Sequence, residues 1–100
     1  MGRVVIVGYR PKPGMDAAVA TLAARHWAVL RAQALVSERP PLLMRAADGT
    51  VVEVFEWLCA ESIERAHHNA AVQALWSEFA AACDYVPVGQ LSEAAQPFSS

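Results

Sequence analysis

The side chains best suited to proton transfer or metal binding include an adjacent pair of histidines, His67 and His68, within the run ERAHHNAAVQALW. If this run is helical, the two rings point about 100° apart, so they do not converge on one ion. Glu64 precedes His67 by three residues and His68 by four, a spacing at which helical side chains can bind one metal ion. The sequence contains neither a second Glu-x-x-His motif nor a His-Glu-x-x-His motif, however. The sequence therefore predicts no metal site. We interpret the run as a joint between two helices, in which Asn69 is the N-cap of the second helix and His68 faces water.

His26 is the third histidine, and it falls inside the apolar arc of a helix that the sequence predicts over residues 15–36. Gln33 lies on the same stripe two turns later. Polar side chains on an apolar face need hydrogen-bonding partners if they are buried. Three interpretations of His26 follow: a core or interface histidine bonded to backbone groups, a lining residue of a ligand pocket together with Gln33, or an exposed residue.

Tryptophans accompany these histidines, and they either fill the core or line a ligand site. Ligand sites are mostly apolar with a few placed polar groups, so a pocket would lie among residues such as Trp57 and Trp76. His67 follows Ile63 by about one helical turn, which allows it to face inward. The candidate pocket residues are therefore His26, Gln33, Trp57, His67 and Trp76.

Two glutamates on a strand expected over residues 50–58 are also relevant to proton transfer. Alternation places Glu53 on the same face as Trp57 and Glu56 on the opposite face. An inward-facing Glu56 would be a buried carboxylate able to act as a base. Either face is compatible with the sequence pattern.

The elements that would position these residues alternate between strands and helices. Strands are expected over residues 3–9, 42–46, 50–58 and 85–91, and helices over residues 15–36, 60–68 and 70–83. Asp48-Gly49 predicts a two-residue type I′ turn between the second and third strands. Pro87 predicts that the last strand lies at a sheet edge or carries a bulge.

This β-α-β-β-α-α-β order predicts an α+β domain with the ferredoxin-like split βαβ fold, in which a four-stranded antiparallel sheet carries its helices on one face. Residues 1–92 would form the single domain, and residues 93–100 a tail that is either mobile or packed on a partner chain. The first strand is apolar on both faces, which indicates that both faces are covered. We therefore expect a homodimer in which the two sheet faces pack on each other.

Composition narrows the classes of function. The chain of 100 residues is 55% hydrophobic, and its net charge of −2 gives no electrostatic footprint for nucleic acid. No apolar run approaches a membrane span, and no basic cluster indicates a membrane surface. Cys59 and Cys83 form no C-x-x-C motif, and we interpret them as reduced structural thiols of a cytoplasmic protein. No glycine-rich phosphate loop is present, and we expect no cofactor.

Two stretches, VVIVGYRPKPGMDAAV and VVEVFEWLCAESIERAHHNAAVQALWSEF, resemble the antibiotic biosynthesis monooxygenase-like family of dimeric α/β-barrel proteins. The resemblance extends over about residues 3–91 and concerns mostly features that mark the fold. It implies a two-fold dimer whose sheets close a barrel, with a pocket between sheet and helices in each subunit. Activities in the family include oxidation of polycyclic aromatic or quinol substrates without metal or cofactor, and haem degradation, while other members have no established activity.

The residues at the matching positions exclude the haem-degrading branch. That branch has an asparagine on its first strand, whereas the first strand here has none. Its tryptophan and histidine positions fall on Ala66 and Trp76. The resemblance then implies a cofactor-independent monooxygenase-type enzyme, acting on an apolar aromatic or quinone-like small molecule with a histidine as proton acceptor. The alternative is a non-catalytic ligand-binding or stress-response dimer, and a third hypothesis is a subunit-assembly protein that uses the C-terminal tail.

Overall fold

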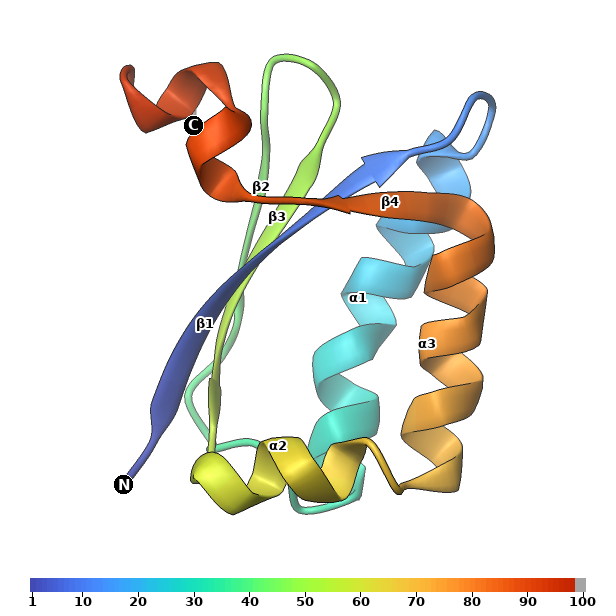
Figure 1. The fold of residues 1–100 in the computed structure, drawn as a ribbon, viewed down its shortest axis with the longest axis vertical. Helices are drawn as coiled ribbons and strands as arrows, with labels where there is room; N and C mark the ends of the chain where they lie inside the picture. The colour runs from blue at the N-terminus through green and yellow to red at the C-terminus, as the bar shows by residue number, and fades with distance from the viewer. Residues whose placement is uncertain (99–100) are drawn as a thin grey trace.

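The computed structural model describes residues 1–98, in which a sheet carries helices on one side (Figure 1). The helices and strands are, in chain order, β1 (Arg3–Pro11), α1 (Asp16–Ala32), β2 (Leu42–Arg45), β3 (Val51–Trp57), α2 (Ala60–Ala66), α3 (Ala70–Ala82) and β4 (Cys83–Val86), followed by the 3₁₀ turns η1 (Val88–Gln90) and η2 (Ser92–Ala94). Within these residues, four antiparallel strands lie in the order β2-β3-β1-β4. This arrangement confirms the predicted ferredoxin-like α+β fold.

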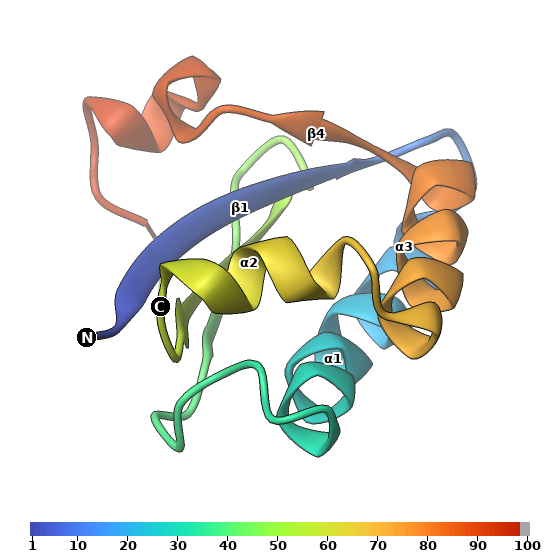
Figure 2. The ribbon, with the colours of Figure 1, turned by 60° about the horizontal axis from the view of Figure 1, so that its bottom comes forward.

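Helices α1 and α3 lie side by side against one face of the sheet, and α2 crosses the end at which β3 finishes (Figures 1 and 2). Most of the buried apolar side chains form two clusters between the sheet and these helices. Within the described residues, no helix is both long and apolar enough to cross a bilayer. The core therefore lies on the helix-covered face, and any site inside it must open between strands and helices.

Helix α1 ends four residues earlier than the sequence predicted, at Ala32 rather than at Val36. Ala34 has a positive φ of 58°, the amide of Leu35 donates to the carbonyl of Leu30, and the amide of Ala34 donates to that of Arg31. This is a Schellman motif, which glycine usually closes. The motif turns the chain so that Leu35 and Val36 are buried beyond the helix and Val36 pairs with Trp57.

The turn between β2 and β3 also differs from the prediction. Gly49 has a positive φ of 92°, but Asp48 does not, so the two-residue type I′ turn was wrong. The amide of Gly49 donates to the carbonyl of Ala46, and the amide of Ala46 donates to that of Thr50. These bonds define a three-residue loop with a left-handed glycine. The Asp48 carboxylate accepts the amide hydrogen of Thr50 at 2.9 Å, which explains why an aspartate suits this position.

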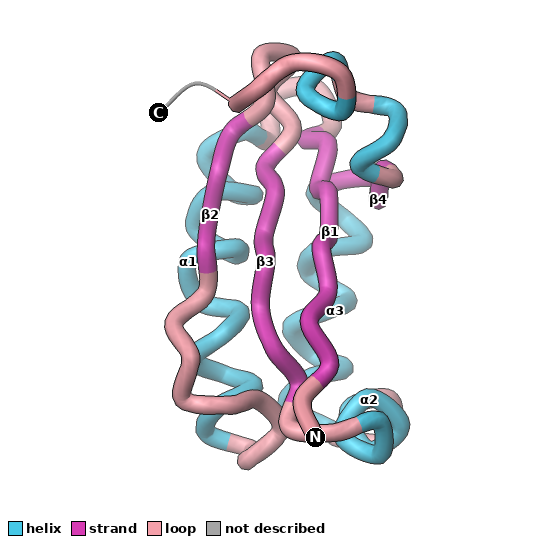
Figure 3. The backbone as a smooth tube through the Cα atoms, turned by 90° about the vertical axis from the view of Figure 1, so that its left-hand side faces the viewer, coloured by secondary structure: helices cyan, strands magenta, loops and turns pink. Residues whose placement is uncertain are grey.

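The open face of the sheet, opposite α1 and α3, is visible in Figure 3. Val4, Ile6 and Leu42 project from it and are 54%, 57% and 55% exposed. Within a single chain, β1 is thus partly to fully buried on its helix side and largely exposed on the other, so the predicted cover of both sides would have to include a second chain. The described residues of one chain leave Val4, Ile6 and Leu42 uncovered on this open face.

The segment after β4 lies over one end of the open face. β4 ends at Val86, before Pro87, rather than continuing to residue 91, and it is an edge strand as Pro87 predicted. Leu91 is buried with Val52 and Val86 on this face, and Phe98 packs against the same cluster. The tail was expected to be mobile or to pack on a partner; within the described residues, Phe98 packs on the chain's own sheet and residues 94–97 are exposed. Residues 99–100 of that tail lie outside the described part of the chain.

Candidate functional site

A cavity of about 340 Å³ lies between the sheet and the helices. β4 pairs only with residues 8–11 of β1, so the first half of β1 has no strand on that side. Apolar side chains of β1 and β3 and aromatic side chains of α3 surround the resulting space. The lining residues are Val5, Val7, Tyr9, His26, Phe55, Trp57, His67, Trp76, Phe79 and Tyr85. The volume lies within the range of small-molecule sites, and the wall is mostly apolar and aromatic.

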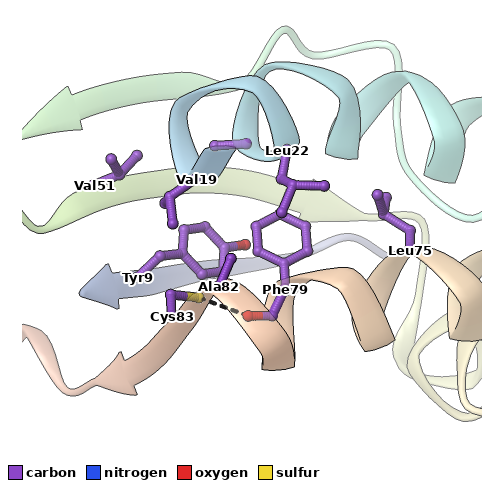
Figure 4. Close-up of a cluster of buried hydrophobic side chains, with 9 residues drawn as sticks. Tyr9, Val19, Leu22, Val51, Leu75, Phe79, Ala82 and Cys83 are labelled. Carbon is purple, nitrogen blue, oxygen red and sulfur yellow. Dashed lines mark hydrogen bonds between the residues drawn. The ribbon is translucent and has the colours of Figure 1, made fainter. Parts of the chain in front are cut away.

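Aromatic packing fixes the inner end of this cavity. The ring of Tyr9 stacks on that of Phe79 at 4.7 Å between centroids, and both side chains are buried beneath α1 (Figure 4). Phe79 also meets the ring of His26 edge-on at 5.3 Å, and Phe55 meets it at 5.4 Å. His26 is therefore held in a fixed orientation by rings from β3 and α3.

A buried carboxylate anchors the polar groups of the site. His26 Nδ1 lies 2.7 Å from Glu53 Oε1, and the hydroxyl of Tyr9 donates to the same oxygen at 2.7 Å. On the other side of the imidazole, the indole N–H of Trp76 donates to His26 Nε2 at 3.0 Å. Elements distant in the sequence, β1, α1, β3 and α3, thus contribute one side chain each to a single hydrogen-bonded chain.

The hydrogen-bond network assigns the protonation of His26. An indole N–H can only donate, so His26 Nε2 must accept and carries no hydrogen. The remaining nitrogen, Nδ1, then holds the hydrogen and donates it to Glu53. His26 is consequently a neutral imidazole whose accepting nitrogen is bonded to Trp76, another lining residue of the cavity, and whose N–H is oriented by a carboxylate. The arrangement is suited to accepting a proton once that nitrogen is free.

Tyr9 remains a hydrogen-bond donor over a wide pH range. Burial, and next the charge of the Glu53 carboxylate and the hydrogen bond to it, raise the pKa of the Tyr9 hydroxyl far above its usual value. Glu53 itself is fully buried, and its second oxygen, Oε2, has no partner within the described residues. A buried carboxylate that is only partly hydrogen-bonded is costly, and such groups are candidates for a functional role.

The face of β3 that carries Glu53 is the one that lies against the helices, which strand alternation alone left undecided. On β3, Val51, Glu53, Phe55 and Trp57 are buried against the helices. Glu56 belongs to the open face, where its carboxylate lies 3.9 Å from Arg39 and is partly exposed. Glu56 is thus not the inward carboxylate that the sequence allowed, and the buried carboxylate of this strand is that of Glu53.

Four of the five candidate pocket residues from the sequence line this one cavity: His26, Trp57, His67 and Trp76. Gln33 does not: it is exposed beyond the end of α1, and its Oε1 accepts a hydrogen bond from Asn69 Nδ2 at 3.0 Å. Asn69 is the N-cap of α3, as predicted, because its side chain accepts from the amide of Val72. Gln33 therefore ties the end of α1 to the start of α3.

The paired histidines separate in space. His67 is exposed but lines the cavity, and its ring meets that of Trp76 edge-on at 5.2 Å, so it lies where the cavity reaches solvent. His68 points into water and lies 3.5 Å from Glu64. Within residues 1–98, no three side chains of the His, Cys, Asp or Glu types gather closely enough to share a metal ion.

Sequence reasoning missed Tyr9 and left Glu53 undecided against Glu56, although both Tyr9 and Glu53 belong to the hydrogen-bonded group around His26. A signal for the pairing of Glu53 with His26 was present. Glu53 shares the strand face of Trp57, and His26 shares an apolar helical face, so each buried polar group needed a partner on the facing element. This requirement could have suggested that His26 and Glu53 bond to each other. They lie 27 residues apart in the sequence, however, so no local pattern indicates the contact.

Comparison with known proteins supports the fold and nothing finer. No family model matches the chain, and no curated protein sequence matches it. Among solved structures, the chain is similar to Rv0793 from Mycobacterium tuberculosis, with a TM-score of 0.69 and 16% sequence identity over 86% of this chain and 89% of that one. At this identity the likeness shows a small α+β fold only.

Proposed function

We propose that the protein binds an apolar aromatic or quinone-like small molecule in the cavity and that His26 accepts a proton from it. The observation that carries the proposal is the neutral His26, buried in a mostly apolar and aromatic wall and oriented by the Glu53 carboxylate at 2.7 Å. Phe55, Trp57 and Trp76 supply flat surfaces against which an aromatic ligand stacks.

The chemistry that this arrangement favours is oxidation of a carbon acid by molecular oxygen without a cofactor. His26 would remove a proton from a CH₂ group between two aromatic rings, and Glu53 would stabilise the imidazolium that forms. The carbanion reduces O₂ and forms a C–O bond, and the resulting peroxide anion takes the proton back from His26 to give a hydroperoxide. Loss of water with the second C–H proton then leaves a ketone, so one oxygen atom enters the product and the other leaves as water. The resemblance to the monooxygenase-like family supports this reaction class.

Ligand binding is tested by calorimetric titration with 2-naphthol, a simple aromatic probe. We expect a Kd of about 10–100 µM, as befits a ligand of this size. Val5→Phe places a ring in the cavity and should weaken binding at least about tenfold. Val4→Phe is the matched control, because Val4 is the neighbouring residue on the open face, and it should leave the Kd unchanged. Equal effects of the two variants would contradict the cavity as the binding site.

Turnover is tested by oxygen uptake with anthrone, a three-ring carbon acid. The wild type should consume one O₂ for each anthrone converted, above the spontaneous rate. His26→Asn should lower this rate about 100-fold, the usual contribution of a positioned base, while 2-naphthol still binds within about threefold of the wild type. Binding without any enzyme-dependent oxygen uptake would instead establish the non-catalytic ligand-binding protein, for which the same cavity suffices.

We also propose that two copies associate through the open faces of their sheets. Three large apolar side chains, Val4, Ile6 and Leu42, are more than half exposed there, and exposed apolar area of this kind favours association. Sedimentation should give twice the chain mass of 10.8 kDa at micromolar concentration. Ile6→Glu places a charge in the middle of this surface and should return the protein to a monomer, whereas the exposed Glu64→Ala should not.

A further inference from the structure

We infer that Trp76 is a positioning residue that occupies the place of the ligand hydroxyl on His26 and gives it up when the ligand binds. The inference rests on the proposed function, because it concerns the same cavity. Its basis is the hydrogen bond from the Trp76 indole to His26 Nε2 at 3.0 Å, which takes up the nitrogen that a substrate would need.

No equivalent acceptor lies beside it among the buried lining side chains that the structure describes. The Tyr9 hydroxyl and His26 Nδ1 both turn toward Glu53 Oε1 and away from a ligand. The indole of Trp57 can only donate. The remaining polar lining groups belong to His67 and Tyr85, both exposed where the cavity meets solvent. A ligand hydroxyl that penetrates the cavity therefore competes with Trp76 for one lone pair.

The two partners of this hydrogen bond differ in mobility. His26 is nearly fully buried, clamped between Phe55 and Phe79, and bonded to Glu53. Trp76 is partly exposed, so its indole can rotate and donate to water instead. The exchange costs no orphaned polar group: His26 accepts from the ligand, and the indole N–H is hydrated. Trp76 therefore keeps His26 neutral and correctly oriented while the cavity is free, and it yields to a donor.

This competition gives the site a selectivity. A ligand with a hydroxyl donor replaces the indole bond, whereas an ether of the same shape has no donor to offer His26 Nε2 and binds with the indole bond still in place. The cavity should thus prefer a hydroxylated aromatic compound to its methyl ether. Removal of the competing indole N–H should strengthen binding of the hydroxyl compound and leave binding of the ether almost unchanged.

The test is a calorimetric comparison of 2-naphthol with 2-methoxynaphthalene. The wild type should bind 2-naphthol about threefold or more tightly than the ether. Trp76→Phe keeps an aromatic ring without the N–H, and it should raise this preference a further five- to tenfold, the usual worth of one neutral hydrogen bond. Trp57→Phe is the matched control, because Trp57 lines the same cavity and its indole does not bond to His26. It should leave the preference at the wild-type value.

A second measurement keeps the inference testable if Trp76→Phe folds poorly. The nitrogen NMR signals of the His26 ring in the wild type should show hydrogen on Nδ1 and an accepting Nε2, both free and with 2-naphthol bound. Hydrogen on Nε2 in the free protein would overturn the inference. If the wild type and Trp76→Phe both bound the two compounds equally well, the inference about Trp76 would be overturned and the proposed function would stand. Failure of both compounds to bind the wild type would overturn the proposed function and this inference with it.

Discussion

The helix-covered face and the open face of the sheet are built from the same strands, but polar side chains are buried on the first and reach solvent on the second. On β3, Glu53 is enclosed and bonded to Tyr9 and His26, whereas Glu56, three residues later, reaches Arg39 at the partly exposed surface. On β1, Val5 lines a cavity, whereas Val4 stands in solvent. One residue of register thus separates a candidate reaction site from a candidate association surface.

The difference shows where each kind of function can reside. A proton acceptor needs a fixed, water-poor setting, which the rings around His26 supply. An association surface needs exposed apolar area, which Val4, Ile6 and Leu42 supply. Matched changes on the two faces should therefore have different effects.

The largest effect is expected from the aromatic packing on the helix-covered face. Phe79→Ala removes a fully buried ring that stacks on Tyr9 and should lower the free energy of unfolding by about 3–5 kcal/mol. Ile6→Ala on the open face should lower it by less than about 1 kcal/mol in the monomer. Urea unfolding at a fixed low protein concentration measures both. Similar losses for the two variants would remove the distinction between the faces.

The next effect concerns the two glutamates of β3. Glu53→Ala leaves the Tyr9 hydroxyl and His26 Nδ1–H without their acceptor, and should lower the free energy of unfolding by about 2–3 kcal/mol. Glu53→Gln retains an acceptor oxygen and should cost about 1 kcal/mol or less. Glu56→Ala is the open-face control and should change stability by about 0.5 kcal/mol at most. A more stable Glu53→Ala protein would show that burial of the charge outweighs its hydrogen bonds.

The two tyrosines give a pH-dependent comparison. Burial and then Glu53 raise the pKa of Tyr9, so its hydroxyl should stay protonated at the pH of about 10 at which an unfolded tyrosine ionises. Its contribution to stability is therefore complete below that pH and declines as the pH rises above it. In a spectrophotometric titration, Tyr85→Phe should remove the early absorbance change, and Tyr9→Phe should remove only the change that accompanies unfolding. If Tyr9→Phe removed the absorbance change that precedes unfolding, the buried network around Tyr9 would be contradicted.

The smallest effect distinguishes the two thiols, one inside the covered core and one at its border. Hydrogen bonding to the Ser62 hydroxyl and then to its backbone N–H lowers the pKa of Cys59, whereas burial raises that of Cys83. Iodoacetamide at neutral pH should therefore label Cys59 several times faster than Cys83. Mass spectrometry of the peptides measures the two rates. Ser62→Ala should slow the labelling of Cys59 and leave Cys83 unchanged.

The order of strands and helices could be predicted from the sequence because hydrophobic period and proline position are local signals. Details that depend on a single backbone angle could not. Ala34 adopts a left-handed conformation that glycine usually provides, so the end of α1 was placed too late. Asp48-Gly49 favours a type I′ turn, but the side chain of Asp48 stabilises the three-residue loop instead.

The candidate site was predictable only in part. His26, Trp57, His67 and Trp76 could be chosen because each is a polar or aromatic residue with an apolar helical or strand neighbourhood. Gln33 shared the stripe of His26, but the helix ended before it could face inward. Glu53 could not be separated from Glu56, because alternation identifies two faces of a strand and the helices alone decide which is covered.

The most direct test of the cavity as the ligand site uses the three indole N–H signals in a ¹H–¹⁵N NMR titration with 2-naphthol. Trp57 and Trp76 line the cavity, whereas Trp27 packs outside it and serves as the internal control. We expect shifts of the Trp57 and Trp76 signals that follow the calorimetric Kd to saturation, and an unchanged Trp27 signal. Saturating shifts at the amides of Val4 and Ile6 with unchanged Trp57 and Trp76 signals would contradict the cavity as the ligand site.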